Sequence, residues 1–305
     1  MESLKTELHC HNIFSNGHVG TLEPIYDCNV TISKQLEQAY LAGLDVLFVT
    51  NHNTIDGYRQ MLEYKKNHQK FDALKVYPAE EVTTDNESHV LVYGIDHSIK
   101  SGLSLHEVLD EARKQNAVTT SPHPFSLLDA LREDSVYCDL FEAFNSSNVD
   151  VYSNLRAKKF AKEKSLHVVA GSDSHVQSTI GRSTNLIHSE NKLDSVIAAM
   201  KHHKISIENT EYVQPKEALE HIRYKIQNSA FFIDKYTSQF YPRALWSIKL
   251  LYKLYMVNPE GIFWNMFYRM SIVALRRISK KINFEGYDHR LFRERNLANI
   301  LKMVF

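Results

Sequence analysis

From residue 4 to about residue 207, short apolar runs alternate with longer segments whose apolar residues stand three or four positions apart. The first pattern predicts buried strands, and the second predicts amphipathic helices. Strands are expected over residues 4–10, 45–50, 74–78, 89–94, 117–120, 140–144 and 167–170. Helices are expected over residues 33–42, 104–116, 151–164 and 192–203. Strands that alternate with helices predict an α/β fold with a largely parallel sheet, whose active site collects at the carboxyl ends of the strands.

After residue 215 the pattern becomes wholly helical. Apolar residues recur at helical spacing over residues 219–233, 245–255 and 263–274, and a fourth helix is expected over about residues 288–303. Pro242 and the Asn-Pro-Glu-Gly turn at 258–261 interrupt the series. We therefore divide the chain into a barrel-sized α/β domain over residues 1–215 and a small, aromatic-rich helical appendage over residues 216–305. The apolar faces of these helices are expected to pack on one another and on the barrel.

The distribution of charge supports the same boundary. The chain has 36 Lys and Arg and 36 Asp and Glu, but residues 216–305 contain 16 of the basic residues and only 7 of the acidic ones. The appendage is therefore basic and the preceding domain acidic. A basic helical region can bind nucleic acid, the anionic surface of a membrane, or the acidic barrel of its own chain. The sequence does not choose among these three partners.

Secretion and membrane insertion are not indicated. The three cysteines, Cys10, Cys28 and Cys138, match no zinc-finger spacing and suit a reducing cytoplasm. The chain begins Met-Glu-Ser-Leu-Lys, without the apolar stretch of a secretory signal. No uncharged run reaches the roughly 18 residues that would favour a membrane-spanning helix. We expect a cytoplasmic protein without a transmembrane segment, and the sequence leaves its oligomeric state open.

Potential metal ligands stand at the ends of the predicted strands. His9 and His11 are two positions apart near the end of the first strand, so both side chains project to the same side. One such pair is more often accidental than a ligand pair, but similar residues recur at later strands. They are Asn51 and His52, Glu80 and Glu81, His89, His123, Glu142 and Asn145, and Asp173 and His175. A parallel barrel would bring this whole series into one bowl, which predicts a metal site there.

Together these residues resemble the motifs of the PHP (polymerase and histidinol phosphatase) family. The resemblance covers about residues 4–213 and rests on the segments 9–17 (HCHNIFSNG), 50–54 (TNHNT), 79–83 (AEEVT) with 89–91 (HVL), 122–124 (PHP) and 171–175 (GSDSH). It implies a distorted (β/α)7 TIM-like barrel with two or three divalent metals, often Mn, Zn or Fe, at the carboxyl ends of the strands. Residues 216–305 show no such resemblance.

The resemblance also implies which residues hold each metal. A first metal would be bound by His9, His11, Glu81 and Asp173. A second would be bound by Glu81, as a bridging ligand, with His89 and His123, and a third by His52, His175 and the residue at Asn16. Glu81 is chosen over Glu80 because an apolar residue and then Thr follow it, as in the family. Glu7 and Glu142 are expected to accept hydrogen bonds from metal-bound imidazoles.

Two positions depart from the family pattern. Asn16 and Asn51 stand where the family usually has Asp, and a neutral amide is a poorer ligand for a hard cation than a carboxylate. Both lie near the third site, so we expect a third metal to bind weakly or not at all. His18 is an alternative ligand there, although its offset from His11 is longer than in the family pattern.

This set of ligands supports phosphoester hydrolysis. Two metals that share a carboxylate can hold a hydroxide between them for attack on phosphorus, because each metal lowers the pKa of bound water. Arg182 is a candidate for the cation that binds the phosphoryl oxygens, although a surface arginine is an equally good interpretation. His175 or His52, if not bound to metal, can protonate the leaving oxygen. We therefore predict a PHP-type metal-dependent phosphoesterase, a phosphatase or phosphodiesterase acting on a small phosphorylated metabolite or nucleotide.

Two other functions are kept as alternatives. One is a nuclease of the 5′–3′ exonuclease type that trims oligonucleotides guided by the basic helices, which predicts salt-sensitive binding of single strands. The other is a catalytically weakened barrel, impaired at Asn16 and Asn51, that binds metal without turnover and serves as a binding or regulatory module. The weakened barrel ranks lowest, because all the inferred ligands of the first two metals are present.

Overall fold

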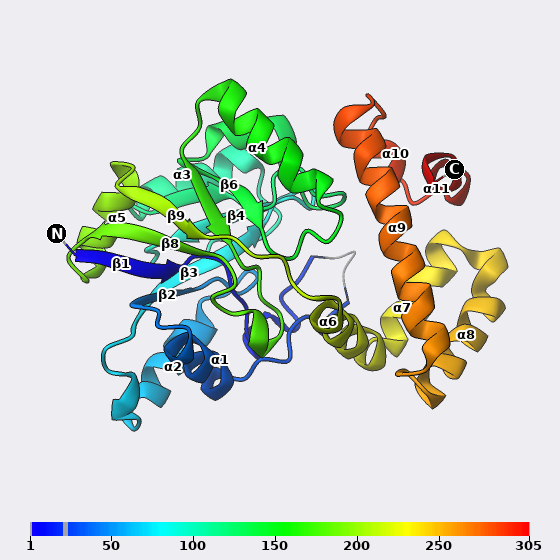
Figure 1. The fold of residues 1–305 in the computed structure, drawn as a ribbon, viewed down its shortest axis with the longest axis horizontal. Helices are drawn as coiled ribbons and strands as arrows, with labels where there is room; N and C mark the ends of the chain where they lie inside the picture. The colour runs from blue at the N-terminus through cyan, green and yellow to red at the C-terminus, as the bar shows by residue number, and fades with distance from the viewer. Residues whose placement is uncertain (1, 21–23, 305) are drawn as a thin grey trace.

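The computed structural model of this chain describes residues 2–20 and 24–304. Its first two thirds form a sheet that curls into a nearly closed barrel with helices on the outside (Figure 1). The strands follow one another across the sheet in the order β7-β6-β5-β4-β3-β2-β1-β8-β9. They are β1 (Glu2–Glu7), β2 (Val46–Val49), β3 (Lys75–Thr83), β4 (His89–Tyr93), β5 (Val118–Ser121), β6 (Leu140–Asn145), β7 (Val168–Gly171), β8 (Thr184–Ser189) and β9 (Ile205–Asn209). The prediction of a distorted TIM-like α/β barrel is confirmed.

The sheet is mixed, so the prediction of a largely parallel sheet is wrong in part. Strands β1, β2 and β3 run parallel to one another, and so do β5, β6 and β7. Strand β4 is antiparallel to both neighbours, because the five residues between β3 and β4 are too few for the crossover that parallel strands need. Strands β8 and β9 form an antiparallel pair beside β1, and their interrupted apolar runs do not predict strands.

The barrel closes between β1 and β7 in two different ways. Just beyond the carboxyl ends of these strands, the backbone N–H of Asp173 donates to the carbonyl of His9 over 2.7 Å. Within the strands themselves, β8 pairs with β1. The buried side chain of Asn185 on β8 then forms the hydrogen bonds to β7 that a neighbouring backbone strand would otherwise form. Its Nδ2 donates to the carbonyl of Ala170 over 2.7 Å, and its Oδ1 accepts from the N–H of Ala170 over 2.9 Å. The closure places the ends of β1 and β7 in contact, where predicted ligands lie.

Five helices in the described part of the barrel cover its outer face. They are α1 (Ile32–Leu41), α2 (Asp56–Lys66), α3 (Leu105–Lys114), α4 (Tyr152–Lys164) and α5 (Leu193–Lys201). All except α2 are predicted from the sequence, and α2 is missed because it buries only Gly57 and Met61 and has no continuous apolar stripe. Helix α3 begins at a capping box in which Ser104 and Glu107 each bond the backbone of the other.

Apolar side chains fill the barrel and the layer beneath its helices. Leu8, Phe48 and Tyr93 belong to the cluster inside the barrel. Separate clusters lie between the sheet and α1 with α2, beneath α3, and beneath α4. Because successive side chains of a strand point to opposite faces, each strand serves both the inner and the outer core. This packing fixes the strand ends, from which the polar residues of the site project.

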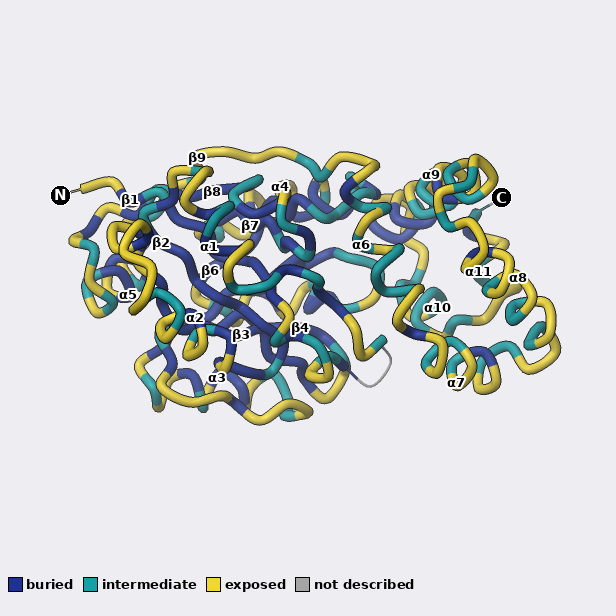
Figure 2. Tube along the Cα trace, turned by 90° about the horizontal axis from the view of Figure 1, so that it is seen from below, coloured by how far each residue is buried: buried dark blue, intermediate teal, exposed yellow. Residues whose placement is uncertain are grey.

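The appendage is helical, as predicted. Its helices are α6 (Pro215–Asn228), α7 (Ala230–Phe240), α8 (Leu245–Val257), α9 (Ile262–Phe284), α10 (Arg290–Arg293) and α11 (Leu297–Val304). The helix expected over residues 219–233 breaks at Ser229, and the last expected helix is likewise divided in two. Helix α9 is anchored to the barrel where Ser279 donates to the buried Asp150 over 2.7 Å. Figure 2 shows a largely buried barrel beside an appendage with many exposed residues on α7 and α8.

No helix in residues 2–20 and 24–304 is both long enough and apolar enough to cross a membrane.

Replacing Asn185 by Ala tests the closure of the barrel. The change leaves the buried N–H and carbonyl of Ala170 without partners, so we expect a loss of about 2–3 kcal/mol in the free energy of unfolding, measured by urea denaturation. Asn209→Ala is the matched control, because the exposed Asn209 also donates to a backbone carbonyl, that of Arg182. An equal loss in both variants would show that Asn185 has no special part in closing the barrel.

Candidate metal centre

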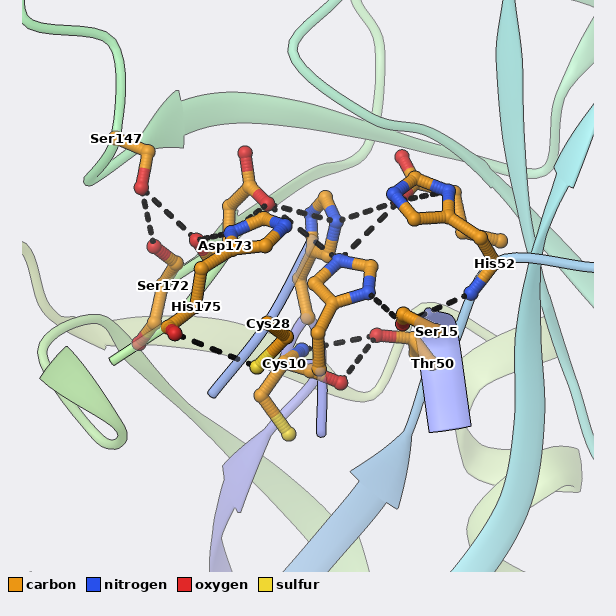
Figure 3. A network of polar contacts seen from close by, with 12 residues as sticks. Cys10, Ser15, Cys28, Thr50, His52, Ser147, Ser172, Asp173 and His175 are labelled. Carbon is orange, nitrogen blue, oxygen red and sulfur yellow. Dashed lines mark hydrogen bonds and ion pairs between the residues drawn. The ribbon is translucent and has the colours of Figure 1, made fainter. Parts of the chain in front are cut away.

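The residues predicted to bind metal meet at the carboxyl end of the barrel. The chain brings together His9, His11, His52, Glu81, His89, His123, Asp173 and His175. They come from the ends of β1, β2, β3, β5 and β7 and from the start of β4. Figure 3 shows His52, Asp173 and His175 turned toward the same central space. Six of the eight are fully buried, and Asp173 and His175 are partly exposed.

The buried carboxylate of Glu81 lies at the centre of this ring. Its Oε2 is 3.4 Å from Nε2 of His9 and 3.3 Å from Nε2 of His11. Its Oε1 is 3.0 Å from Nδ1 of His89 and 3.1 Å from Nε2 of His123. One carboxylate therefore faces two groups of imidazoles, as a bridging ligand must.

Asp173 lies beside the first of these groups. Its Oδ1 is 3.5 Å from Nε2 of both His9 and His11, so these three residues and Glu81 surround one point. Both Asp173 and His123 have backbone conformations in the left-handed region, with φ values of 50° and 30°. Such conformations are unfavourable for residues other than glycine and concentrate at functional sites.

Hydrogen-bond contacts at Nδ1 hold several imidazoles with Nε2 turned toward the centre of the ring. His9 Nδ1 lies 2.9 Å from Glu142 Oε1, His11 Nδ1 lies 3.1 Å from Ser15 Oγ, and His175 Nδ1 lies 2.9 Å from the carbonyl of Asp173. These contacts leave Nε2 as the nitrogen that can bind a metal. Glu142 thus lies where it was expected to accept a hydrogen bond from an imidazole. Glu7 does not, because it accepts hydrogen bonds from backbone N–H groups and from Ser172 instead.

A third group of candidate ligands includes Asp27, which the sequence pattern does not single out. Its buried Oδ2 lies 3.0 Å from Nε2 of His175 and 3.6 Å from Nε2 of His52. Asp27 belongs to the loop before α1, where no periodic pattern marks it. The expectation of a weak third site assumed that no carboxylate lies there, and that assumption is wrong. His18, the alternative ligand, is exposed.

Asn16 and Asn51 organise loops at this edge of the ring. The Oδ1 of Asn16 accepts from the N–H groups of Asp27 and Cys28 over 2.7 Å and 3.0 Å, and its Nδ2 donates to the carbonyl of Cys28. The Oδ1 of Asn51 accepts from the N–H of Asn12 over 2.8 Å. Asn16, which the resemblance places among the ligands, therefore holds the segment that carries Asp27.

The donor atoms of the ring fit divalent metal ions. Among the described residues, the buried atoms without a hydrogen bond include His9 Nε2, His11 Nε2 and His52 Nδ1. A buried polar atom without a partner costs about 1–3 kcal/mol, so several of them turned toward one space indicate a missing ligand. Groups of three or four such side chains have donor atoms within 4.8 Å of one another. Mixed imidazole and carboxylate donors suit Zn, Mn and Fe alike.

The titratable groups of the ring control one another's charge. Burial raises the pKa of Glu81, but His89 and the other imidazoles outweigh burial and hold this pKa well below its usual range. Burial also opposes a charge on His123, but Asp129 and Glu81 outweigh it and raise the pKa to about 9. Burial lowers the pKa of His52 to about 3. The centre thus favours cations, and protons compete with metals for the same nitrogens.

Arg182 does not enter the ring. Its guanidinium forms ion pairs with Glu211, over 2.8 Å, and with Glu217 of α6. Of the two interpretations of Arg182 that the sequence left open, a cation in the bowl and an arginine outside it, these ion pairs favour the second. Arg182 is close in sequence to Asp173 and His175, but its ion pairs with Glu211 and Glu217 hold its guanidinium outside the ring.

Helix α6 instead contributes two residues to the pocket above the ring. The Nζ of Lys225 lies 2.9 Å from Oδ1 of Asp27, and the ring of His221 stacks on that of His175 with centroids 4.4 Å apart. The pocket is about 230 Å³ and is lined by the ring residues other than His9 and His11, and by Asp27, Asp129, Ser147, His221 and Lys225. Neither residue of α6 was predicted, because no local pattern in the sequence relates this helix to the barrel.

Comparison with known proteins agrees with this geometry. The model of the PHP-associated family PHP_C matches residues 151–205. Two uncharacterised proteins of Methanocaldococcus jannaschii are similar. One is 28% identical over 165 residues, which are 52% of this chain and 93% of that protein, and the other is 25% identical over 232 residues, 73% and 80% of the two chains.

Two solved structures share the fold. PsfC from Pseudomonas syringae PB-5123 has a TM-score of 0.51 at 19% identity and covers 74% of this chain and 99% of its own. The lesion-specific endonuclease PfuEndoQ from Pyrococcus furiosus has a TM-score of 0.51 at 16% identity, and the match covers 68% of this chain but only 58% of that enzyme. The fold is that of a barrel with its functional groups at the carboxyl ends of the strands. The family match over residues 151–205 and the ring of candidate ligands agree with the resemblance of this chain to the PHP family.

Replacing Glu81 by Ala tests its place as the bridging ligand. Because Glu81 faces both groups of imidazoles, we expect the variant to lose both metals of the pair, measured as metal content per chain after purification with Mn. Glu80→Gln is the control, since Glu80 lies on the opposite side of β3 and accepts a hydrogen bond from the N–H of Ile99. Full metal content in Glu81→Ala would contradict the bridging assignment.

Glu80 also predicts a dependence of stability on pH. Burial raises its pKa from the ordinary value of 4.5 to about 7. Between these values the folded chain holds a proton that the unfolded chain has released, so the contribution of Glu80 to stability falls as pH rises and then levels off above the folded pKa.

In Glu80→Gln this fall in stability with rising pH is absent, because glutamine does not ionise. Relative to the wild type, the variant should gain roughly 3 kcal/mol of unfolding free energy between pH 4.5 and pH 7, at 1.36 kcal/mol per pKa unit. Urea denaturation at several pH values, with a chelator present to remove metal effects, measures the difference. The control variant Glu63→Gln, at an exposed position, should show the same dependence of unfolding free energy on pH as the wild type. If the difference in unfolding free energy between Glu80→Gln and the wild type did not change with pH, the raised pKa of Glu80 would be contradicted.

Proposed function

We propose that this protein is a metal-dependent phosphoester hydrolase that acts on a small phosphorylated metabolite or nucleotide. The observation that carries the proposal is the ring around Glu81, where one carboxylate faces two groups of imidazoles. Pairs of metal sites that share a carboxylate are typical of phosphoesterases. The proposed cofactors are two divalent ions, Mn, Zn or Fe, with the group around Asp27 as a third site.

The residues of the chain have separate roles in this reaction. Metals held by the ring would lower the pKa of water and neutralise charge on the phosphoryl oxygens. Lys225 takes the place we had assigned to Arg182, because its ammonium group lines the pocket and can bind a phosphoryl oxygen. When no metal occupies the third site, His175 is the better suited of the two predicted proton donors. Burial opposes a charge on both, but Asp27 outweighs burial at His175 and raises its pKa, whereas the pKa of His52 falls to about 3.

The size of the pocket supports a small substrate. Its volume of about 230 Å³ suits a phosphate with a compact organic group, and α6 forms one wall of it. Endonuclease Q has been solved with a 27-mer duplex that has an abasic lesion at the active site, whereas in this chain His221 and Lys225 of α6 line a small pocket above the ring. We therefore keep the nuclease as the second candidate, and the metal-binding module without turnover as the third.

Hydrolysis of p-nitrophenyl phosphate and of bis-p-nitrophenyl phosphate, each with added Mn, tests the proposal. We expect turnover of the monoester, and a loss of at least about 100-fold in kcat in His123→Ala, because His123 faces the shared carboxylate. His106→Ala, at a residue of α3 outside the ring, should keep full activity. Preferential turnover of the diester would favour the nuclease, and bound metal without turnover of either ester would favour the binding module.

A further inference from the structure

The helices of the appendage expose a large apolar surface. Trp246 and Val257 of α8 and Ile262 of α9 are 85%, 84% and 80% exposed. Along α8, the exposed residues Trp246, Leu250, Leu254 and Val257 recur three or four positions apart, so they form one stripe. Val257 and Ile262 flank the turn between α8 and α9, which makes the tip of this helical hairpin apolar as well. We call the α8 stripe and this tip the apolar surface of the appendage.

The packing of the chain does not account for this surface. The other side of α8 carries Ile248, Tyr252 and Tyr255, which face α6 and α9 around a common cavity. Helix α8 is therefore apolar on two sides, and only one side is covered within the described chain. A soluble monomer rarely exposes a continuous apolar patch of this kind unless the patch binds something.

The charges around the apolar surface indicate what it binds. From α8 to the end of α9 the chain has seven basic residues. Lys253 is exposed on α8 beside Leu254 of the apolar surface, Lys249 of α8 is paired with Asp234 over 3.0 Å, and Arg269 is exposed on the first half of α9. Arg276, Arg277, Lys280 and Lys281 lie toward the other end of α9, where the helix is anchored to the barrel. The whole stretch from α8 to the end of α9 has one acidic residue, Glu260, which is paired with Arg223 over 2.6 Å. A surface that is both apolar and basic suits a partner that offers hydrocarbon together with negative charge.

We propose that the apolar surface of the appendage binds the surface of an anionic membrane. Apolar and aromatic side chains enter the boundary between headgroups and acyl chains, and nearby lysines and arginines contact anionic headgroups. A second copy of this chain would bury the apolar residues but bring like charges together. A nucleic acid would pair with the charges but leave Leu250, Val257 and Ile262 without an apolar partner. A membrane surface satisfies both, and because no described helix can span the bilayer, the protein would lie at its interface.

A cavity beneath this surface is also suited to lipid. It is about 440 Å³, lies between α6, α8 and α9, and is walled mostly by Ile, Leu, Phe, Trp and Tyr. Such apolar cavities hold water poorly and hydrocarbon well. Phe263 and Phe267 are more than half exposed and also line the cavity, so it opens toward the apolar surface. An acyl chain could enter from the membrane without unfolding the hairpin.

Co-sedimentation of the full chain with vesicles tests the proposal without using turnover, so its result is independent of the proposed hydrolase activity. We expect binding to vesicles of phosphatidylcholine with 30% phosphatidylglycerol, weakened by salt, and little binding to phosphatidylcholine alone. The double variant Trp246→Asp with Val257→Asp should lower the partition coefficient at least about tenfold. Its matched control is Leu41→Asp with Leu155→Asp, at exposed apolar positions of the barrel, which should bind like the wild type.

A second pair of changes tests the role of charge. Lys253→Gln with Arg269→Gln should weaken binding to the anionic vesicles about tenfold or more and reduce its dependence on salt. Thermal unfolding confirms that each variant remains folded. Equal binding of the wild type to neutral and anionic vesicles, or binding to neither, would overturn the proposal. Dimerisation of the wild type that is lost in Trp246→Asp with Val257→Asp would identify a second copy as the partner, and tight binding of oligonucleotides that depends only on Lys253 and Arg269 would identify nucleic acid.

Discussion

The site depends on the attraction between one buried carboxylate, that of Glu81, and the imidazoles around it. A carboxylate without water is costly unless opposite charges and hydrogen-bond donors surround it. Strands β1 and β4 and the loops after β2 and β5 all supply such groups, so their ends must converge on β3. Gly171 at the end of β7 shows how close this convergence is. A Cβ there would overlap the carboxylate of Glu142 and lie 2.7 Å from Cβ of His9.

Much of the barrel and most of the ring can be predicted from the sequence because their signals are local. His9 and His11, His52 and His123 each stand next to an apolar run, and a barrel gathers the ends of its strands whatever the lengths of its loops. The choice of Glu81 over Glu80 rests on the resemblance, in which an apolar residue and then Thr follow the ligand, and the alternation of side chains along β3 places the two glutamates on opposite faces. Helices α1, α3, α4 and α5 have apolar residues at helical spacing, and their bounds follow within a few positions.

The remaining features depend on contacts between distant segments. Asp27 lies in a loop without periodicity and reaches His175 only because the chain folds back over the barrel. Lys225 enters the pocket through the docking of α6, and Arg182 leaves it because Glu211 and Glu217 compete for its guanidinium group. Strand β8 has an interrupted apolar run, so only its contacts identify it as a strand. These are its pairing with β1 and the hydrogen bonds between the side chain of Asn185 and Ala170 of β7. Such contacts leave no local pattern in the sequence.

The position of α6 separates the residues that would hold metal from the residues that shape the pocket. The groups that would hold metal belong to the barrel, whereas one wall of the pocket and its lysine belong to the appendage. Substitutions in α6 can change which molecules fit while the strand ends that carry the ring stay in place, although His221 contacts His175 of the ring and Lys225 contacts Asp27. A protein with the same barrel and a different helix in the place of α6 would therefore keep the ring of side chains and enclose a different pocket.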